Sequence, residues 1–156
     1  LMAGAFQTIK HNTKLIEYNV KLDIPAAKKI ASAWPSPVVW SGYEIGIAAA
    51  YPWQSIIDDY NYVDPHLIKD SYLAYVPEHP HDRPTWDLTA VLHAVYPERG
   101  YFSLSPDGHA TVSDEGRTDF SVHDDGNDRY LIMNETQAAR VRETFVQLCT
   151  EPPVRK

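Results

Sequence analysis

The stretch from Arg83 to Tyr96 constrains the fold most, because its apolar residues recur with the period of an α-helix. Four of them follow the i, i+3, i+4, i+7 spacing that places side chains on one helical face: Leu88, Val91, Leu92 and Val95. Pro84 suits a first helical turn, and Pro97 cannot continue a helix. The sequence therefore predicts a helix over 83–96 whose apolar stripe packs inward.

One carboxylate, Asp87, lies at the start of this predicted helix, directly after Trp86. Ala90 and Ala94 follow on the same side and leave room for a ligand. The helix dipole favours an acid in a first turn, so the plain interpretation is a helix-start residue. The alternative is that a packed helix holds Asp87 rigidly as a metal or sugar ligand. The helix and the carboxylate alone do not decide between the two.

The N-terminal region contributes a second polar pair. Residues 1–6 (LMAGAF) are small and apolar without the charged start of a signal peptide, and we interpret them as the end of a core strand in a longer protein; the alternative is an edge strand that follows a true start at Met2. A polar loop over 7–14 leads into 15–20, where Glu17 and Asn19 would share one face of an extended segment. A carboxylate beside an amide suits a sugar hydroxyl, although a solvent-facing polar pair is the commoner meaning of this pattern.

Prolines, glycines and capping residues divide the rest of the chain into short elements. We predict helices over 23–34, 44–51, 65–75 and 136–148, and strands over 38–40, 101–104, 110–112, 118–122 and 129–133. The predicted packing positions on the first and last of these helices are Ala26, Ala27, Ile30, Ala33, Ala138, Val141, Phe145 and Leu148. The fold class is α/β, with an antiparallel meander after Gly100, one domain over 1–150 and a tail over 151–156.

The charge of the chain restricts its partners. The net charge is −7, so the chain lacks the basic face that nucleic-acid phosphates require. No apolar run reaches the ~18 residues of a membrane span. The single cysteine, Cys149, excludes an internal disulfide, and its place beside the last predicted helix favours a buried structural thiol over a nucleophile. The sequence does not determine the compartment, with the cytoplasm favoured, and it leaves homo-oligomer formation open.

Two further polar clusters have the composition of metal sites. His79, His81 and Asp82 lie in a proline-containing loop over 76–83, but no second cluster completes a coordination sphere. The acidic run 124–128 departs from the spacing of a calcium-binding loop. We interpret the first cluster as part of a polar loop and the second as a hairpin turn.

Three separated stretches, taken in order, resemble the family of inosine-uridine preferring nucleoside hydrolases. They are LMAGAF at 1–6, Glu17-Tyr18-Asn19 followed by Asp23 and Ala26-Ala27, and Asp87 with the LTAVL that follows it. The WPSPVVWSG stretch and the hairpin ending in DDGNDRYL are also similar to the C-terminal half of that family. The resemblance implies an open α/β fold and a calcium-dependent hydrolase that cleaves the N-glycosidic bond of ribonucleosides to base and ribose.

The resemblance also implies roles for individual residues. Asp87 would bind the calcium ion, Glu17 and Asn19 would hold the ribose hydroxyls, and Met2 would line the sugar pocket. These roles suit the chemistry, because glycosidic cleavage passes through an oxocarbenium-like sugar and is accelerated by clamped hydroxyls and a metal-activated water.

Three other positions match the family less directly. Asn12 corresponds to a further ribose-binding asparagine, with the neighbouring His11 as the alternative because the loop spacing differs. Where many members carry a histidine that protonates the departing base, this chain has Trp86, which either stacks on the base or packs against the helix. His93 lies six residues after Asp87 and is not promoted to the role of general acid.

The chain departs from the family in one respect that affects activity. The aspartate-rich motif D-x-D-x-x-x-D-D, which supplies most calcium ligands and the base that activates water, is absent, and Asp58-Asp59 does not replace it. Calcium takes about six to eight oxygens, and Asp87 alone cannot supply them. The expectation is therefore a C-terminal half that needs a missing N-terminal half of the same polypeptide, and that binds calcium weakly and turns over nothing alone.

A second class of function competes with this one. The tryptophans and the tyrosines between 51 and 75 could form the stacking surface of a non-catalytic carbohydrate- or protein-binding module: Trp34, Trp40 and Trp53 are its candidates. The two hypotheses make different structural demands. The hydrolase needs Glu17, Asn19 and Asp87 to converge on one cleft, whereas the binding module needs coplanar surface aromatics.

Overall fold

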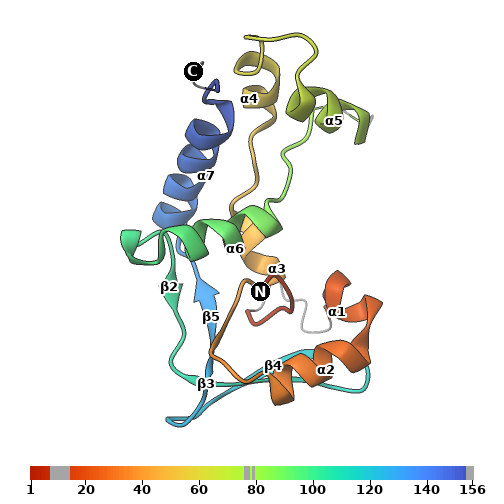
Figure 1. Ribbon diagram of the computed structural model, residues 1–156, viewed down its shortest axis with the longest axis vertical. Coiled ribbons are helices and arrows are strands. Elements are labelled where there is room, and N and C mark those ends of the chain that lie inside the picture. The colour runs from red at the N-terminus through yellow and green to blue at the C-terminus, as the bar shows by residue number, and fades with distance from the viewer. Residues whose placement is uncertain (8–14, 76–77, 79, 154–156) are drawn as a thin grey trace.

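The computed structural model describes residues 1–7, 15–75, 78 and 80–153. The chain combines helices with one mixed five-stranded sheet, so the α/β class is confirmed (Figure 1). The helices are α1 (Tyr18–Leu22), α2 (Ile24–Ala33), α3 (Tyr43–Ala48), α4 (Trp53–Asp58), α5 (Leu67–Tyr75), α6 (Trp86–Val95) and α7 (Glu135–Thr150), with a 3-10 turn at Pro97–Arg99. The strands are β1 (Val38–Trp40), β2 (Ser103–Leu104), β3 (Gly108–Val112), β4 (Thr118–Val122) and β5 (Asp128–Ile132). No helix among these described residues is long and apolar enough to cross a lipid bilayer.

The strands do not follow the meander order that the sequence predicted. Strand β5 pairs in parallel with β1 and antiparallel with both β2 and β3, while β4 pairs with β3. The order β1-β5-β3-β4 therefore places β4 and β5 on opposite edges of β3, although they follow each other in the sequence. The predicted meander is wrong because the turn between β4 and β5 crosses the end of β3.

Two glycines make that crossing possible. Gly108 pairs with Val122 of β4 on one side and with Asp128 of β5 on the other. The turn passes over it at Gly126, where an added Cβ would lie 2.2 Å from the carbonyl oxygen of Gly108. Only a residue without a side chain fits where two backbones approach so closely.

Helix α6 forms where it was predicted, but most residues of its predicted inward stripe face solvent. Leu92 is 3% exposed, whereas Val91 and Val95 are 57% and 59% exposed. The buried residues of α6 are Thr89 and Leu92, and the hydroxyl of Thr89 hydrogen-bonds to that of Ser41 at 2.8 Å. The inward stripe is therefore confirmed for Leu92 and wrong for Leu88, Val91 and Val95, because the loop before α3 contacts the Thr89 side of the helix.

The N-terminal elements also differ from the prediction. The predicted strand over 1–6 reduces to one parallel bridge between Met2 and Ser41. The predicted extended segment over 15–20 is wrong, because α1 begins at Tyr18. The reason is local: the Glu17 carboxylate accepts the backbone N–H groups of Asn19 and Val20 and caps the helix.

Side-chain caps begin α2 and α7; the sequence indicated the Asp23 cap of α2, which is confirmed, but not the cap of α7. The Asp23 carboxylate accepts the N–H of Ala26 at 2.9 Å with Pro25 in the first turn of α2. Asn134 and Gln137 form a capping box at the start of α7. Some packing positions were wrong: Ala26, Ala33 and Leu148 are exposed, while Ala27 and Ile30 pack against the core.

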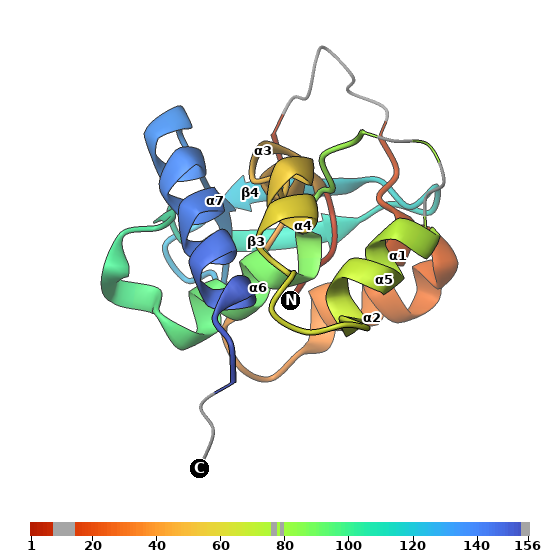
Figure 2. The ribbon, with the colours of Figure 1, turned by 90° about the horizontal axis from the view of Figure 1, so that it is seen from above.

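The core consists of two clusters of buried residues. One cluster joins α3, α4, α6 and α7 through residues that include Ile45, Ile56, Leu92, Leu131 and Phe145. The other lies under α2 and contains Ala3, Val20, Trp40, Ala110 and Val112. Seen from above, α7 lies on the side of the molecule opposite to α1, α2 and α5 (Figure 2). The N-terminus lies beside α6 (Figure 1).

Candidate functional site

A pocket of ≈ 550 Å³ opens where the N-terminal segment, α1 and the start of α6 meet. Its described lining residues are Met2, Glu17, Tyr18, Asn19, Tyr43, Tyr75, Arg83, Trp86 and Asp87. The structure thus places Met2, Glu17, Asn19 and Asp87 around one pocket although they come from three separate parts of the chain. Asn12 and its alternative His11 lie outside the described residues.

Glu17 is the buried carboxylate among the residues that line this pocket. It is 4% exposed, and its Oε2 accepts the N–H groups of Gly4 at 3.2 Å and Val20 at 3.1 Å. Its Oε1 accepts the N–H of Asn19 at 2.9 Å. Because a carboxylate oxygen has two lone pairs, Oε1 has one acceptor site that no described residue uses and that a ligand hydroxyl could occupy. The same contacts tie residues 2–4 to α1 and so determine where Met2 lies.

Asn19 stands at the pocket edge, oriented by Met2. Its Nδ2 donates to the Met2 carbonyl at 3.2 Å and contacts the Met2 sulfur at 3.1 Å. The amide oxygen is an acceptor that these contacts do not use. The predicted pair of Glu17 and Asn19 therefore reaches one site by a helix cap rather than by strand alternation.

Asp87 and Trp86 enter the pocket from the first turn of α6. Asp87 is exposed, and its position lets the helix dipole stabilise its charge. Two groups already lie against the Trp86 indole: the Tyr43 ring stacks on it with 5.5 Å between centroids, and the Arg83 guanidinium carbon lies 5.5 Å from it. Its Nε1 also donates to the Tyr43 carbonyl at 2.9 Å. Packing therefore occupies much of the ring that was expected to stack on a base.

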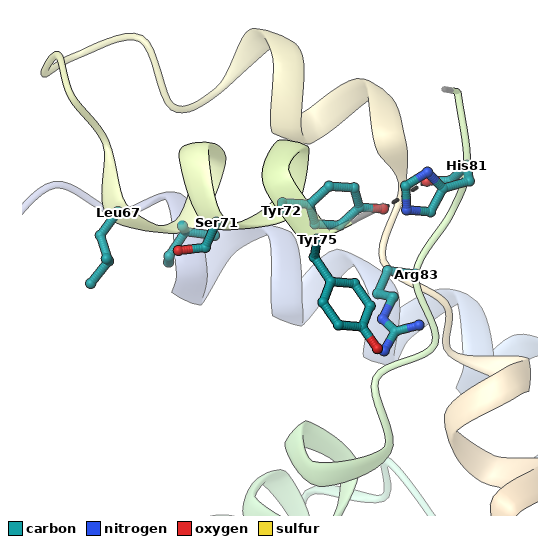
Figure 3. A pocket seen from close by; sticks show the side chains of 7 residues that line it. Leu67, Ser71, Tyr72, Tyr75, His81 and Arg83 are labelled. Atoms are coloured by element: carbon teal, nitrogen blue, oxygen red, sulfur yellow. Dashed lines mark hydrogen bonds between the residues drawn. The ribbon is translucent and has the colours of Figure 1, made fainter. Parts of the chain in front are cut away.

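Arg83 and Tyr75 are pocket residues that sequence reasoning did not place in the nucleoside site; Tyr75 was considered only as part of a stacking surface, and Arg83 had no role. The Arg83 guanidinium carbon lies 4.6 Å from the centroid of the Tyr75 ring, and a bridge between Arg83 and Tyr51 holds its backbone. Both residues also line a second hollow of ≈ 450 Å³ under α5, where Tyr72 donates to the His81 carbonyl at 2.6 Å (Figure 3). The only signal in the sequence was a cationic residue directly before Pro84 and four residues before the carboxylate Asp87.

A third, more aromatic hollow adjoins the first. It has a volume of ≈ 440 Å³ and shares Arg83, Trp86 and Asp87 with the polar pocket. Its other walls include Tyr51, Tyr60, Tyr72, Leu88 and Cys149. Burial raises the pKa of the Cys149 thiol, which keeps it protonated and argues against a nucleophile there. The chain thus places a polar hollow and an aromatic hollow on two sides of one wall.

The described pocket residues do not by themselves fit a calcium ion. Calcium prefers about six to eight oxygen ligands. Asp87 offers an exposed carboxylate, but the oxygens of Glu17 already accept three backbone N–H groups, and the lining also includes the cation of Arg83. This donor set is too small for a calcium site.

The other predicted sites are also located by the structure. Trp40 is 1% exposed and Tyr51 and Tyr60 are buried, so they cannot belong to the surface of a binding module; Trp34 is exposed, and Trp53 lies against Tyr72. His79 lies outside the described residues, and the ring of His81 stacks on Tyr72 with 5.1 Å between centroids. The His93 ring packs edge-on against Phe102 and does not line the polar pocket.

Behind the pocket wall lies a buried carboxyl group, Glu44. Its Oε1 accepts the N–H of Phe6 at 3.2 Å, while Oε2 has no hydrogen-bond partner in the described part of the chain. Burial raises the pKa of the Glu44 carboxyl above its usual value, against the lowering effect of the nearby backbone N–H groups. Glu44 follows Tyr43, which forms part of the pocket, so its charge state bears on the stability of that wall.

We expect Glu44→Gln to reduce the pH dependence of stability. Because the folded pKa is raised, the folded state prefers the protonated carboxyl, and stability is full below the usual glutamate pKa and falls as pH rises through the raised value. Glutamine stays uncharged and removes this fall. Urea unfolding between about pH 4 and pH 7, with the exposed Glu143→Gln as control, measures it. A constant difference between wild type and Glu44→Gln across that range would contradict the prediction.

No protein-family model matches the chain, and no curated protein matches it at a significant level of similarity.

Proposed function

We propose that this chain forms the sugar- and base-binding part of an N-glycosyl hydrolase that acts on ribonucleosides. The observation that supports it is the pocket that gathers Met2, Glu17, Asn19 and Asp87 from distant parts of the sequence. Carboxylate and amide oxygens are suitable acceptors for the hydroxyls of a furanose. The pocket volume of ≈ 550 Å³ lies within the range of about 300–1,000 Å³ that is usual for small-molecule sites.

The charges around the pocket suit cleavage of an N-glycosidic bond. The bond breaks through a sugar with oxocarbenium character, which carries positive charge. Glu17 and Asp87 place carboxylates beside that sugar, and fixed negative groups stabilise developing positive charge. The departing base develops negative charge. The guanidinium of Arg83 is the described cation of the pocket and would stabilise it.

The arrangement of the two adjoining hollows suits the two halves of a nucleoside. The polar hollow with Glu17 and Asn19 would hold the ribose. The base, which is flat and largely apolar, would lie across the shared wall toward Trp86 and the tyrosines of the third, more aromatic hollow. Exposed Tyr75, with 68% of its surface accessible, is available to stack on the base from the Arg83 side.

In this proposal, calcium binding needs ligands from a further part of the polypeptide. Because the described donors do not complete a calcium site, the other ligands would come from an N-terminal half of the same polypeptide. The exposed apolar face of α6 supports such a covering segment: Leu88, Val91 and Val95 lie directly beyond the pocket carboxylate Asp87. In calorimetry, tight one-to-one calcium binding by these 156 residues alone would contradict this division of ligands.

A binding experiment tests the proposed substrate class. Inosine, 2′-deoxyinosine and hypoxanthine are titrated separately while tryptophan fluorescence and amide shifts are recorded. We expect the ribonucleoside to bind most tightly, because the 2′-deoxy compound loses a hydroxyl contact and the free base loses all of them. Asn19→Ala should weaken inosine binding about 2- to 10-fold, the value of one lost hydrogen bond.

The matched control is Asn61→Ala, since the Asn61 amide donates to the Ile57 carbonyl outside the pocket. It should leave inosine binding unchanged. Equal affinity for hypoxanthine and inosine, or no inosine binding at millimolar concentration, would contradict the assignment of this pocket to a ribonucleoside.

A further inference from the structure

A second polar site lies on the sheet, outside the pocket. The side chains of His109, His123 and Asp125 each offer one metal-ligating atom, and these atoms all lie within 4.8 Å of one another. Both imidazoles face the same carboxylate oxygen: His109 Nε2 lies 3.6 Å and His123 Nδ1 3.3 Å from Asp125 Oδ1. None of the three residues lines the candidate ribose pocket. From this geometry we propose a binding site for a divalent transition-metal ion, with zinc as the reference ion.

The register of the sheet brings the two histidines together. His109 of β3 pairs with Ser121 of β4, and His123 follows two residues later. Residues in this diagonal relation lie on the same face of a sheet and are within reach of long side chains. Ala110 and Val112 belong to the core cluster under α2, so alternation along β3 places His109 on the opposite, solvent-facing side.

Hydrogen bonds also hold the backbone around Asp125, the third proposed ligand. The His123 N–H donates to the Asp107 carbonyl at 3.0 Å, and the Gly126 N–H donates to the His123 carbonyl at 3.0 Å. The close approach of Gly126 to Gly108 fixes the same turn onto β3. Asp125 therefore projects from a constrained turn, and a preorganised turn reduces the entropy lost on metal binding.

The separations between the ligand atoms fit a small divalent ion. Zinc binds imidazole nitrogen and carboxylate oxygen at about 2.0–2.2 Å, which in a tetrahedron separates ligand atoms by about 3.4 Å. The two observed separations of 3.3 and 3.6 Å lie close to that value. Two nitrogens and one oxygen favour zinc and later first-row metals over calcium, which prefers oxygen. The remaining coordination position would hold water.

A bound metal ion would link β3 to the turn that follows β4. Without metal, ion pairs between such exposed groups contribute little to stability. With metal, binding to the folded state alone stabilises it by mass action. We therefore expect zinc to raise the melting temperature of the chain in a concentration-dependent manner.

Titration of the metal-free chain with zinc chloride tests the proposal, with calorimetry for stoichiometry and visible absorption of cobalt(II) for the ligand set. We expect one site whose affinity falls at least about 10- to 100-fold in His109→Ala and in His123→Ala, since even outer-shell changes have effects of that size. Asp125→Asn should also weaken it. His93→Ala, which removes a histidine away from the cluster, is the control.

Calcium chloride at the same concentration should leave the melting temperature of this chain nearly unchanged. Circular dichroism confirms that each exposed variant folds. Zinc binding that persists in the double variant His109→Ala/His123→Ala would overturn the proposal, as would the absence of a zinc-dependent rise in melting temperature in the wild-type chain.

Discussion

Replacing Gly126 with alanine is expected to prevent the sheet from forming, with a loss of more than about 3 kcal/mol in the free energy of unfolding. The new Cβ would lie 2.2 Å from the Gly108 carbonyl oxygen and 2.3 Å from its carbonyl carbon and Cα. These are backbone atoms that cannot rotate away as a flexible side chain could. Relief of the clash would require β4 or β5 to separate from β3, and urea unfolding followed by circular dichroism measures the result.

Gly100→Ala provides a matched comparison. Gly100 has a left-handed φ of +69°, but an added Cβ there would meet no atom within 4 Å. Its expected cost is therefore only that of the backbone conformation, about 1–2 kcal/mol. If the Gly126→Ala variant had the same free energy of unfolding as the Gly100→Ala variant, or a higher one, the close crossing of the turn over β3 would be wrong.

The second large effect is expected at Asp87. Asp87→Asn should weaken inosine binding by about 10- to 100-fold, because hydrogen bonds to a charged group contribute about 1.5–3 kcal/mol. The fold should be spared, since the side chain is exposed. In any longer polypeptide that hydrolyses nucleosides, Asp87→Ala should abolish turnover. Fluorescence titration of the 156-residue chain and a base-release assay on such a polypeptide measure these effects.

Asp70→Asn is the control for this substitution. Asp70 is also an exposed acid in the first turn of a helix, α5, but it does not line the polar pocket. The two changes remove the same charge and the same interaction with a helix dipole, which is worth about 0.3–1 kcal/mol. Equal inosine affinity in the two variants would show that Asp87 is a helix-start acid without a ligand.

Local signals in the sequence predicted several elements well. The Asp23 cap with Pro25 determined the start of α2, and the core positions Val141 and Phe145 of α7 follow from helical spacing. The turn between β3 and β4 formed at Gly116, whose φ of +84° needs a glycine. Caps, turns and short-range periodicity depend on residues a few positions apart, so one sequence can reveal them.

The face of α6 is the clearest case in which local pattern was insufficient. Of the four residues on the predicted stripe, Leu92 is buried beside Thr89, whereas Leu88, Val91 and Val95 are exposed. Periodicity placed all four on one inward face, but the contact between Thr89 and Ser41 turns the Thr89 side of the helix inward, which buries Leu92 alone of the four. A helix that is apolar around most of its circumference has no unique inward face until its neighbours are placed.

The sequence by itself determined the α/β class, the acidic charge and the short list of polar residues from which the pocket is drawn. Tertiary structure alone decided the strand order, the inclusion of Arg83 and Tyr75 in that pocket, and the meeting of His109 with His123 and Asp125. The physical reason is chain distance: backbone crossings and side-chain clusters between remote segments depend on packing, which no local pattern encodes.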